Sequence, residues 1–215
     1  MAVKKVGIVR FLGTNCDEDV KKWVTSKSYN CEYLWFDNQF NTKDYDMVII
    51  PGGFSHGDYL RCGALAAQTP VMSSVNEFAK QGKPILGICN GFQILCEAGL
   101  LPGVLLRNDS LKFKDEWILL KVKQNQTAFS LNIQKDQLIK LPIAHGEGKY
   151  YAEDSTLKQL QDKNQIWLTY EKNPNGSVLN IAGITNENKN ICGLMPHPER
   201  ALFDWMGSTD GMYFL

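Results

Sequence analysis

Short apolar runs alternate with amphipathic stretches along the first half of the chain. In the stretch 17–26, Val20, Trp23 and Val24 recur at the spacing that places them on one face of a helix. The apolar runs contain few polar residues, which is typical of strands buried on both faces of a parallel sheet. Strand and helix alternate in a way that favours such a sheet with helices on both faces. The pattern predicts strands at 6–11, 32–36, 47–50 and 84–88, and helices at 17–26, 71–80 and 92–98.

The second half of the chain is richer in strand-like segments. One helix is predicted at 155–162, and the run from Asn173 to Ser177 is a strong turn signal. No repeat, low-complexity tract or linker divides the sequence. We therefore predict a single α/β domain over residues 1–215, in which a mostly parallel sheet carries an added antiparallel layer. The strands predicted in this half are 117–122, 137–141, 166–170, 180–185 and 191–195.

Charge and apolar content narrow the classes of function. The sequence has 23 Lys and Arg residues and 23 Asp and Glu residues, so its formal net charge is zero. That balance gives no electrostatic reason to expect nucleic acid or an anionic membrane as a partner. No apolar run approaches the roughly 20 residues of a membrane-spanning helix. The apolar run near the N-terminus fits a first strand better than a signal peptide, and we expect a cytoplasmic protein.

The cysteines give no sign of a disulfide framework or a metal centre. None of the six forms a C-x-x-C pair, and no histidine lies near them at the spacing of zinc ligands. Because no such spacing occurs, we predict no metal site in this chain. Disulfides are not expected either, because they are rare in the reducing compartment predicted here.

One cysteine stands where chemistry is expected. The segment Gly87-Ile88-Cys89-Asn90-Gly91 joins a predicted strand to a predicted helix. A nucleophile flanked in this way by glycines lies on a sharp turn that lifts its side chain out of the sheet. The amino end of the following helix favours the thiolate, which is the reactive form. Cys89 is thus a candidate nucleophile, and a buried structural cysteine is the alternative.

A second segment offers an acid–base residue. His197 lies in Pro196-His197-Pro198-Glu199, just after a predicted strand. Each proline disfavours the helical region for the residue before it, so His197 is expected to be extended. In an extended chain, residues two apart share a side, and Glu199 is therefore placed to orient the imidazole. The alternatives are a loop histidine and a surface carboxylate.

A thiol nucleophile needs N–H groups that stabilise the tetrahedral intermediate. The backbone N–H of Asn90, next to Cys89, is one candidate donor. The turn Pro51-Gly52-Gly53, which follows the predicted strand 47–50, offers the N–H of Gly53 as the other. An ordinary strand-ending turn is the alternative for this segment.

Together these segments resemble the triad-type, class I glutamine amidotransferase family. Within it, the chain is similar to the glutaminase subunits of phosphoribosylformylglycinamidine synthases, which act in de novo purine biosynthesis. Leu12 and His56 stand where that group usually has Pro and Tyr. The supporting runs are Gly13 to Asp17, Gly52 to Ala64, Gly87 to Gln93, Ala144 to Gly148, Pro196 to Glu199 and Gly207 to Gly211.

The resemblance implies a fold, a reaction and partners. It implies a flavodoxin-like, doubly wound fold and the hydrolysis of glutamine to glutamate and ammonia through a cysteine thioester. Cys89, His197 and Glu199 would be the catalytic residues, with the N–H groups of Gly53 and Asn90 as the oxyanion hole. Gln93 would contact the substrate glutamine, and His145 and Glu147 would lie at the rim of the active site or contact a partner, or form only a structured glycine-rich turn.

The expected partners are a large synthetase subunit and a small accessory subunit. The sequence has no G-x-x-x-x-G-K-[ST] loop and no G-x-G-x-x-G after a strand, so ATP and Mg²⁺ are expected on the synthetase subunit and no cofactor on this chain. Three other functions remain open: the glutaminase of another amidotransferase, a cysteine peptidase of the same fold, and a non-catalytic regulatory subunit.

Overall fold

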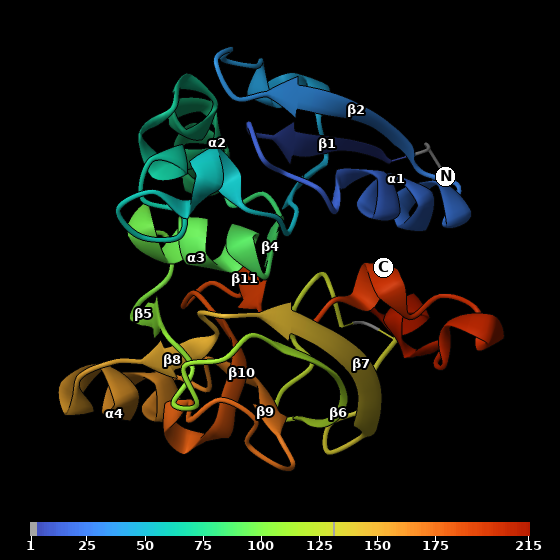
Figure 1. Ribbon diagram of the computed structural model, residues 1–215. Coiled ribbons are helices and arrows are strands. Elements are labelled where there is room, and N and C mark those ends of the chain that lie inside the picture. Colours follow the sequence, from blue (N-terminus) through green and yellow to red (C-terminus); the bar gives the residue numbers. More distant parts are fainter. Residues whose placement is uncertain (1–3, 131) are drawn as a thin grey trace.

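A nine-stranded sheet runs through the molecule and changes character at its middle. The computed structural model describes residues 4–130 and 132–215. The strand order is β2-β1-β3-β4-β11-β10-β9-β6-β7, and a separate two-stranded sheet pairs β5 with β8. The strands from β2 to β11 pair in parallel, whereas those from β11 to β7 pair antiparallel. Figure 1 shows the parallel part above and the antiparallel part below.

The parallel part is built from the first half of the chain. Its strands are β1 (Lys5–Arg10), β2 (Asn30–Trp35), β3 (Met47–Ile50) and β4 (Ile85–Ile88), and its helices are α1 (Asp17–Ser26), α2 (Pro70–Lys80) and α3 (Asn90–Glu97). Helix α1 lies on one side of the strands, and α2 and α3 lie on the other (Figure 1). The chain adds β2 on one side of β1, and β3 and β4 on the other side. Because crossovers between parallel strands are right-handed, this change of direction places the connecting helices on opposite faces of the sheet. Every residue of β3 and β4 is buried. The α/β doubly wound fold class predicted from the sequence is confirmed.

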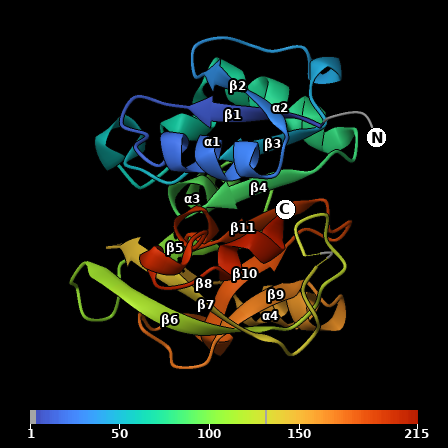
Figure 2. The ribbon, with the colours of Figure 1, turned by 90° about the vertical axis from the view of Figure 1, so that its right-hand side faces the viewer.

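The antiparallel part continues the same sheet. Its strands are β6 (Lys114–Val122), β7 (Leu138–His145), β9 (Ile166–Tyr170), β10 (Ile181–Thr185) and β11 (Ile191–Leu194), and α4 (Asp154–Asp162) precedes β9. Strand β11 joins the two parts because it pairs in parallel with β4 and antiparallel with β10. Figure 2 shows β11 next to β4, with the antiparallel strands below it.

The largest differences from the sequence prediction are two short strands and the lengths of two others, while most other elements shift by one or two residues at their ends. β5 (Val104–Leu106) and β8 (Lys149–Tyr151) were not predicted, since each has only three residues. Strand β7 runs past Pro142, where the predicted strand stops at 141. Proline is tolerated there because β7 is the last strand of the sheet and one of its sides needs no partner. β6 is likewise longer than predicted, with Trp117 and Leu119 exposed on its outer face.

Among the residues that the structure describes, no helix is long and apolar enough to cross a membrane.

Candidate active site

The turn between β4 and α3 holds Cys89 in an uncommon backbone conformation. Its φ is 51° and its ψ is −106°, a region that residues with a side chain rarely adopt. Such strain persists only where the surroundings enforce it, and it is most often found at functional sites. The Cys89 N–H donates to Leu194 O at 2.8 Å, which ties the turn to the end of β11. The thiol is therefore presented at the carboxyl ends of β4 and β11, above the sheet.

The two glycines of the segment are required by the packing of this turn. A Cβ atom at Gly91 would lie 1.9 Å from Ile50 O, and one at Gly87 would lie 2.6 Å from Gly91 O. The start of α3 thus packs directly on the end of β3. Because no side chain fits at either position, the G-x-Cys-x-G pattern follows from the close approach of helix and strand.

His197 and Glu199 form a buried pair on the other side of the thiol. The His197 N–H donates to Pro142 O at 2.9 Å, so the segment after β11 is attached to β7. His197 Nδ1 lies 2.6 Å from Glu199 Oε1, and each residue is only 1% exposed. Burial by itself lowers the pKa of His197, but the Glu199 carboxylate and then the Cys89 thiol raise it well above its usual value. The imidazolium form is therefore favoured beside Cys89.

The turn after β3 packs against both the residue that carries the thiol and the imidazole, with Gly52 as the point of contact. A Cβ atom at Gly52 would lie 2.8 Å from His197 Cε1 and 3.4 Å from Cys89 Cβ. Any side chain at Gly52 would push the two residues apart. The Cys89 Sγ also lies 3.7 Å from Ala144 O, at the end of β7. Three segments that are distant in the sequence thus converge on the thiol.

Two backbone N–H groups belong to segments that adjoin the thiol, the turn after β3 and the start of α3. Gly53 has φ 151°, and among the described residues its N–H has no backbone acceptor within hydrogen-bonding distance. Asn90 is the first residue of α3, where the N–H has no partner within the helix. The Asn90 side chain accepts a hydrogen bond from the Ser55 N–H at 3.1 Å. The two donor segments are therefore fastened to each other.

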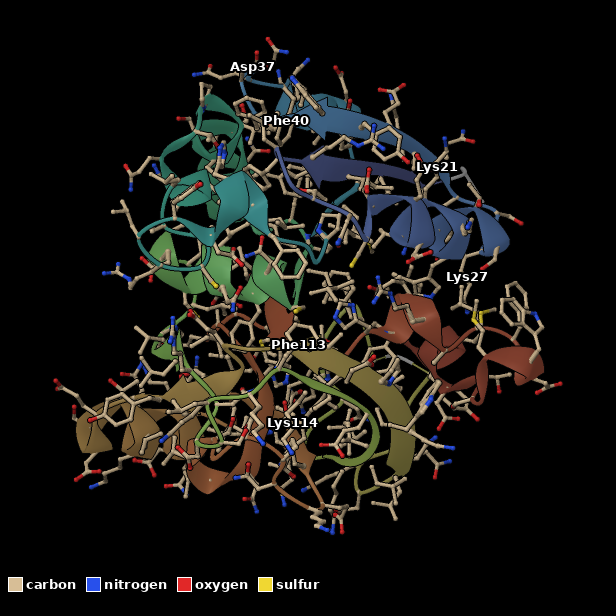
Figure 3. All side chains as sticks on the ribbon, viewed as in Figure 1. Lys21, Lys27, Asp37, Phe40, Phe113 and Lys114 are labelled. Atoms are coloured by element: carbon tan, nitrogen blue, oxygen red, sulfur yellow. The ribbon has the colours of Figure 1, made fainter. Side chains whose placement is uncertain are left out.

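A pocket of about 270 Å³ opens in front of Cys89. Charged side chains from two loops line it, and Arg107 Nε lies 3.5 Å from Glu147 Oε1. Asp58 lines it from the loop after β3. Figure 3 labels Phe113, which lines the same pocket from the segment that leads into β6. The pocket can therefore take a small zwitterionic molecule with its reactive end at the thiol.

The comparisons with known proteins agree with this geometry. Residues 3–211 match the family described as a CobB/CobQ-like glutamine amidotransferase domain. The chain is 42% identical to a chain in the structure of PurLQS from Thermotoga maritima, with a TM-score of 0.91 and coverage of 98% of this chain and 95% of that one. This chain belongs to the CobB/CobQ-like glutamine amidotransferase family.

More distant amidotransferases share the fold. A glutamine amidotransferase from Thermotoga maritima is 18% identical, with a TM-score of 0.62 and coverage of 94% of this chain and 78% of that one. A glutamine amidotransferase from Methylobacillus flagellatus is 14% identical, with a TM-score of 0.60 and coverage of 92% and 71%. At these identities the likeness concerns the fold of the amidotransferase domain alone.

The structure brings the six residues proposed from the sequence into one part of this amidotransferase. Gln93, 6% exposed, donates from Nε2 to Glu147 O at 2.7 Å and accepts at Oε1 from Asn90 Nδ2 at 2.9 Å. It thus fastens the 147 loop to α3 and also lines the pocket. The other five of the six, described above, are Cys89, His197, Glu199, Gly53 and Asn90.

The two other histidines lie in different surroundings. His145 lines the pocket and its Nδ1 lies 3.2 Å from Asn108 Oδ1. Burial, and then the charge of His197, lower the pKa of His145 to about 4, so its imidazole is neutral at physiological pH. His56 packs edge-on against the rings of Phe11 and Phe36. Neither of these two lies in the triad.

Three further residues of the site were not identified from the sequence. Cys16 and Arg200 line a cavity together with His197, and Arg107 lines the pocket in front of Cys89. Cys16 belongs to a run that carries the family resemblance, but no spacing rule relates it to residue 197. Arg107 has no distinguishing signal at all, because it stands in an irregular segment after the short β5.

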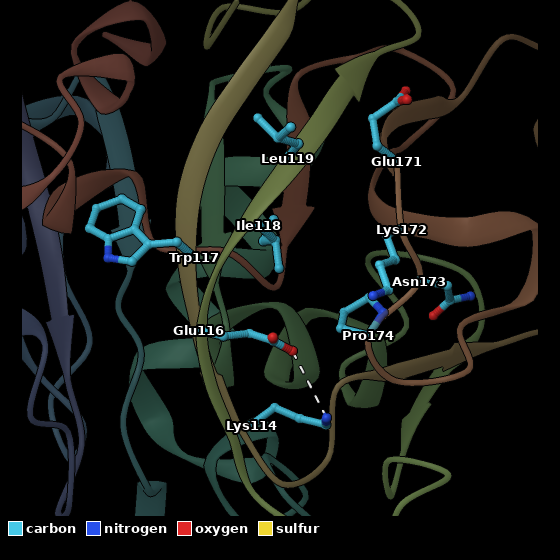
Figure 4. Close-up of a pocket in the computed structure, with 9 residues that line it drawn as sticks. All are labelled: Lys114, Glu116, Trp117, Ile118, Leu119, Glu171, Lys172, Asn173 and Pro174. Carbon is cyan, nitrogen blue, oxygen red and sulfur yellow. Dashed lines mark ion pairs between the residues drawn. The ribbon is translucent and has the colours of Figure 1, made fainter.

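Another hollow, of about 390 Å³, lies away from the thiol. It is formed by β6 and the turn after β9, and Figure 4 shows Lys114 and Glu116 on its β6 side facing Lys172 and Pro174. Lys114 Nζ lies 4.0 Å from Glu116 Oε1. Because no nucleophile or histidine lines it, the chemistry of the amidotransferase belongs to the pocket at Cys89.

Proposed function

We propose that this chain is a glutaminase that supplies ammonia to a synthetase subunit making phosphoribosylformylglycinamidine in de novo purine biosynthesis. The observation that carries the proposal is the 42% identity, over 98% of this chain, to a chain of PurLQS, combined with a buried His197–Glu199 pair next to a strained Cys89. In this proposal residues 1–215 act as one glutamine amidotransferase domain.

The reaction begins at the thiol. The Cys89 thiolate attacks the side-chain amide carbon of glutamine, while the imidazolium of His197 gives its proton to the departing ammonia. The N–H groups of Gly53 and Asn90 hold the negative oxygen of the tetrahedral intermediate. His197 then accepts a proton from a water molecule that hydrolyses the thioester, and glutamate leaves.

Glu199 keeps the imidazole in the orientation that this sequence needs. Its Oε1 accepts from His197 Nδ1 at 2.6 Å, which leaves Nε2 as the nitrogen that exchanges protons with the substrate. The carboxylate also stabilises the imidazolium, in agreement with the raised pKa of His197. Glu199 therefore orients and is not consumed.

Charged groups in the pocket suit the amino acid end of glutamine. Arg107 offers a guanidinium for the α-carboxylate, and Asp58 and Glu147 offer carboxylates for the α-ammonium group. Gln93 fixes the main chain at Glu147 and forms part of the wall that the substrate contacts. A free amino acid is therefore preferred over a peptide, whose neighbouring residues would cover these charges.

The rest of the synthase reaction takes place on other subunits. We place ATP and Mg²⁺ on the synthetase subunit, because no phosphate-binding motif occurs in this sequence. A small accessory subunit completes the proposed complex, which works in the cytoplasm. Ammonia passes between subunits along a shielded route, since free ammonia would be protonated and lost to solvent.

Reconstitution tests the proposal. The isolated chain should release glutamate from glutamine slowly, and addition of the synthetase subunit, accessory subunit and nucleotide should raise the rate. A gain of about 10²–10³-fold would correspond to one oxyanion donor being brought into place. Casein should not be cleaved under either condition. If the isolated chain cleaves casein but not glutamine, or if a glutamine-analogue affinity label fails to alkylate Cys89, the proposed function is wrong.

A further inference from the structure

A buried amide lies behind the loops that line the pocket in front of Cys89. Asn108 is fully buried and follows Arg107 in the segment after β5. Its Nδ2 donates to Lys112 O and to His145 O, both at 2.9 Å. Because both of these acceptors are carbonyl oxygens, they fix the orientation of the amide and leave Oδ1 as its accepting atom.

The same side chain holds the turn 145–148, which follows β7. Asn108 Oδ1 accepts from the Gly148 N–H at 3.1 Å, and His145 Nδ1 lies 3.2 Å from it. The Asn108 N–H donates to Gly146 O at 3.0 Å. Since Oδ1 can only accept, the neutral imidazole of His145 carries its proton on Nδ1. Asn108 therefore bonds to the beginning, the middle and the end of this turn.

Other buried amides hold the rest of the turn. Gln93 Nε2 donates to Glu147 O at 2.7 Å, and Asn175 Nδ2 donates to Gly148 O at 2.9 Å. A Cβ atom at Gly148 would lie 2.3 Å from His145 Cε1, so the turn packs directly on the imidazole ring. The turn is thus held in one conformation by buried hydrogen bonds and close packing.

Asn108 joins the two segments that carry charges proposed for substrate recognition. Arg107 is its neighbour in the chain, and Glu147 lies in the turn that it holds. Arg107 Nε lies 3.5 Å from Glu147 Oε1, but the Arg107 side chain is 76% exposed. An ion pair this exposed contributes little to holding its members in place. The relative position of the two charges therefore depends on the buried bonds of Asn108, together with the pairing of β5 with β8.

We propose that Asn108 is a positioning residue that sets the spacing of Arg107 and Glu147, and thereby the affinity for the α-carboxylate and α-ammonium groups of glutamine. This inference rests on the proposed glutaminase function. Asn108 is not among the residues that line the pocket, and the thiol and His197 are carried by other segments. Loss of its bonds should therefore weaken substrate binding and leave the chemical step intact.

Steady-state kinetics of the reconstituted complex give the first test. Asn108→Asp keeps the shape of the side chain but cannot donate to Lys112 O and His145 O. The KM for glutamine should rise about 10–100-fold, the scale expected when buried acceptors lose their donors, and kcat should stay within about threefold. An unchanged KM, or a loss confined to kcat, would overturn the proposal.

A matched control makes the same exchange at an amide outside the site. Asn125 lies in the segment after β6, and its Nδ2 donates to Ile133 O at 2.9 Å. Asn125 does not line the pocket, so Asn125→Asp should keep the KM of the parent protein. A similar rise of KM in Asn125→Asp and Asn108→Asp would assign the effect to general loosening of the domain and would also overturn the proposal.

Alkylation of Cys89 separates recognition from reactivity. A diazoketone analogue of glutamine carries the α-amino acid groups, whereas iodoacetamide does not, and mass spectrometry of the Cys89 peptide measures both rates in the full chain. Asn108→Asp should slow the analogue about 10–100-fold at low concentration and leave the iodoacetamide rate near that of the parent protein. An equal slowing of both reagents would refute the positioning role. Failure of the parent protein to react with the analogue would instead count against the proposed function.

A second variant guards against misfolding of the first. Asn108→Ala removes the side-chain bonds without adding a charge beside His145, and thermal unfolding verifies that each variant folds. The folded variant should show the same split between KM and kcat and between the two reagents. If neither variant folds, Asn108 serves the stability of the domain and the proposal is rejected.

Discussion

The nucleophile and its acid–base partner come from regions that hold their side chains by different means. Around Cys89, the backbone decides the position, because Gly91 lets α3 pack against β3 and Gly87 lets it pack against β4 with no side chain between them. Around His197, a side-chain hydrogen bond of 2.6 Å to Glu199 and a main-chain bond to Pro142 O decide it. A change near Cys89 should therefore shift the backbone that carries the thiol, whereas a change at the pair should leave the backbone in place and alter the proton transfers.

The largest effect should come from removing the thiol. Cys89→Ala should abolish glutamine-dependent synthesis by the reconstituted complex, a loss of about 10⁴-fold or more. Synthesis from added ammonia should remain, because the ammonia-using site is on another subunit. Parallel assays with glutamine and with ammonium chloride measure both, and Cys31→Ala is the control. Loss of both activities in a folded Cys89→Ala protein would mean that the site does more than release ammonia.

The next largest effect distinguishes His197 from Glu199 by the loss of glutaminase rate when each is replaced. His197→Ala should cost nearly as much as Cys89→Ala, since the proton transfers are lost. Glu199→Gln should cost about 10–100-fold less, because an orienting residue commonly contributes less than the nucleophile or the base. Steady-state glutamate release with each purified variant measures the difference, and thermal unfolding verifies that both fold. Equal loss in the two variants would show that Glu199 acts directly on protons.

A backbone change should affect stability as well as activity. Gly91→Ala would place a Cβ atom 1.9 Å from Ile50 O and should lower the free energy of unfolding by about 1–3 kcal/mol. The glutaminase rate should fall with it, since the turn that carries Cys89 must shift. Gly146→Ala is the matched control for stability, because its nearest neighbour, Phe113 Cδ2, is 3.8 Å away. Urea titration measures the free energy of unfolding of both variants. An unchanged unfolding midpoint for Gly91→Ala would contradict the close packing of α3 on β3.

The smallest effect concerns the pH dependence of stability. The folded protein lowers the pKa of His145 to about 4, whereas the unfolded chain has a value near 6.5. Between these values the unfolded state binds more protons, so the stability that neutral His145 contributes above pH 6.5 falls as the pH falls and is lost below about pH 4. The loss amounts to at most about 3 kcal/mol. His145→Gln should show a shallower decline in urea titrations between pH 7 and 4, and parallel curves for the two proteins would contradict the shift.

The sequence predicted local structure best where the residues of a single segment determine its conformation. The strands β3 and β9 and the helix α1 were predicted at their observed bounds. In each of them, the residues that the fold buries are apolar and recur at the spacing of the element. The glycines around Cys89 predicted the turn because only a backbone without side chains can make it. Prolines on both sides of His197 predicted an extended chain there, and His197 itself has φ −108° and ψ 89°. Residues Pro198–Arg200 form a 3₁₀ turn and do not continue the extended chain, yet Glu199 still reaches the imidazole, with Nδ1 and Oε1 2.6 Å apart.

Tertiary structure decided everything that depends on segments distant in the chain. Strand β11 pairs with β4, and this pairing carries His197 to Cys89. The close approach of the loops around Gly52 brings Cys16 to the same imidazole, and no periodicity or spacing links residue 16 to residue 197. Backbone hydrogen bonding between strands depends only weakly on which residues form them, so partner choice is fixed by the packing of the whole sheet. For this reason the sequence by itself determined the chemistry of each segment, and the fold determined which segments act on the same substrate.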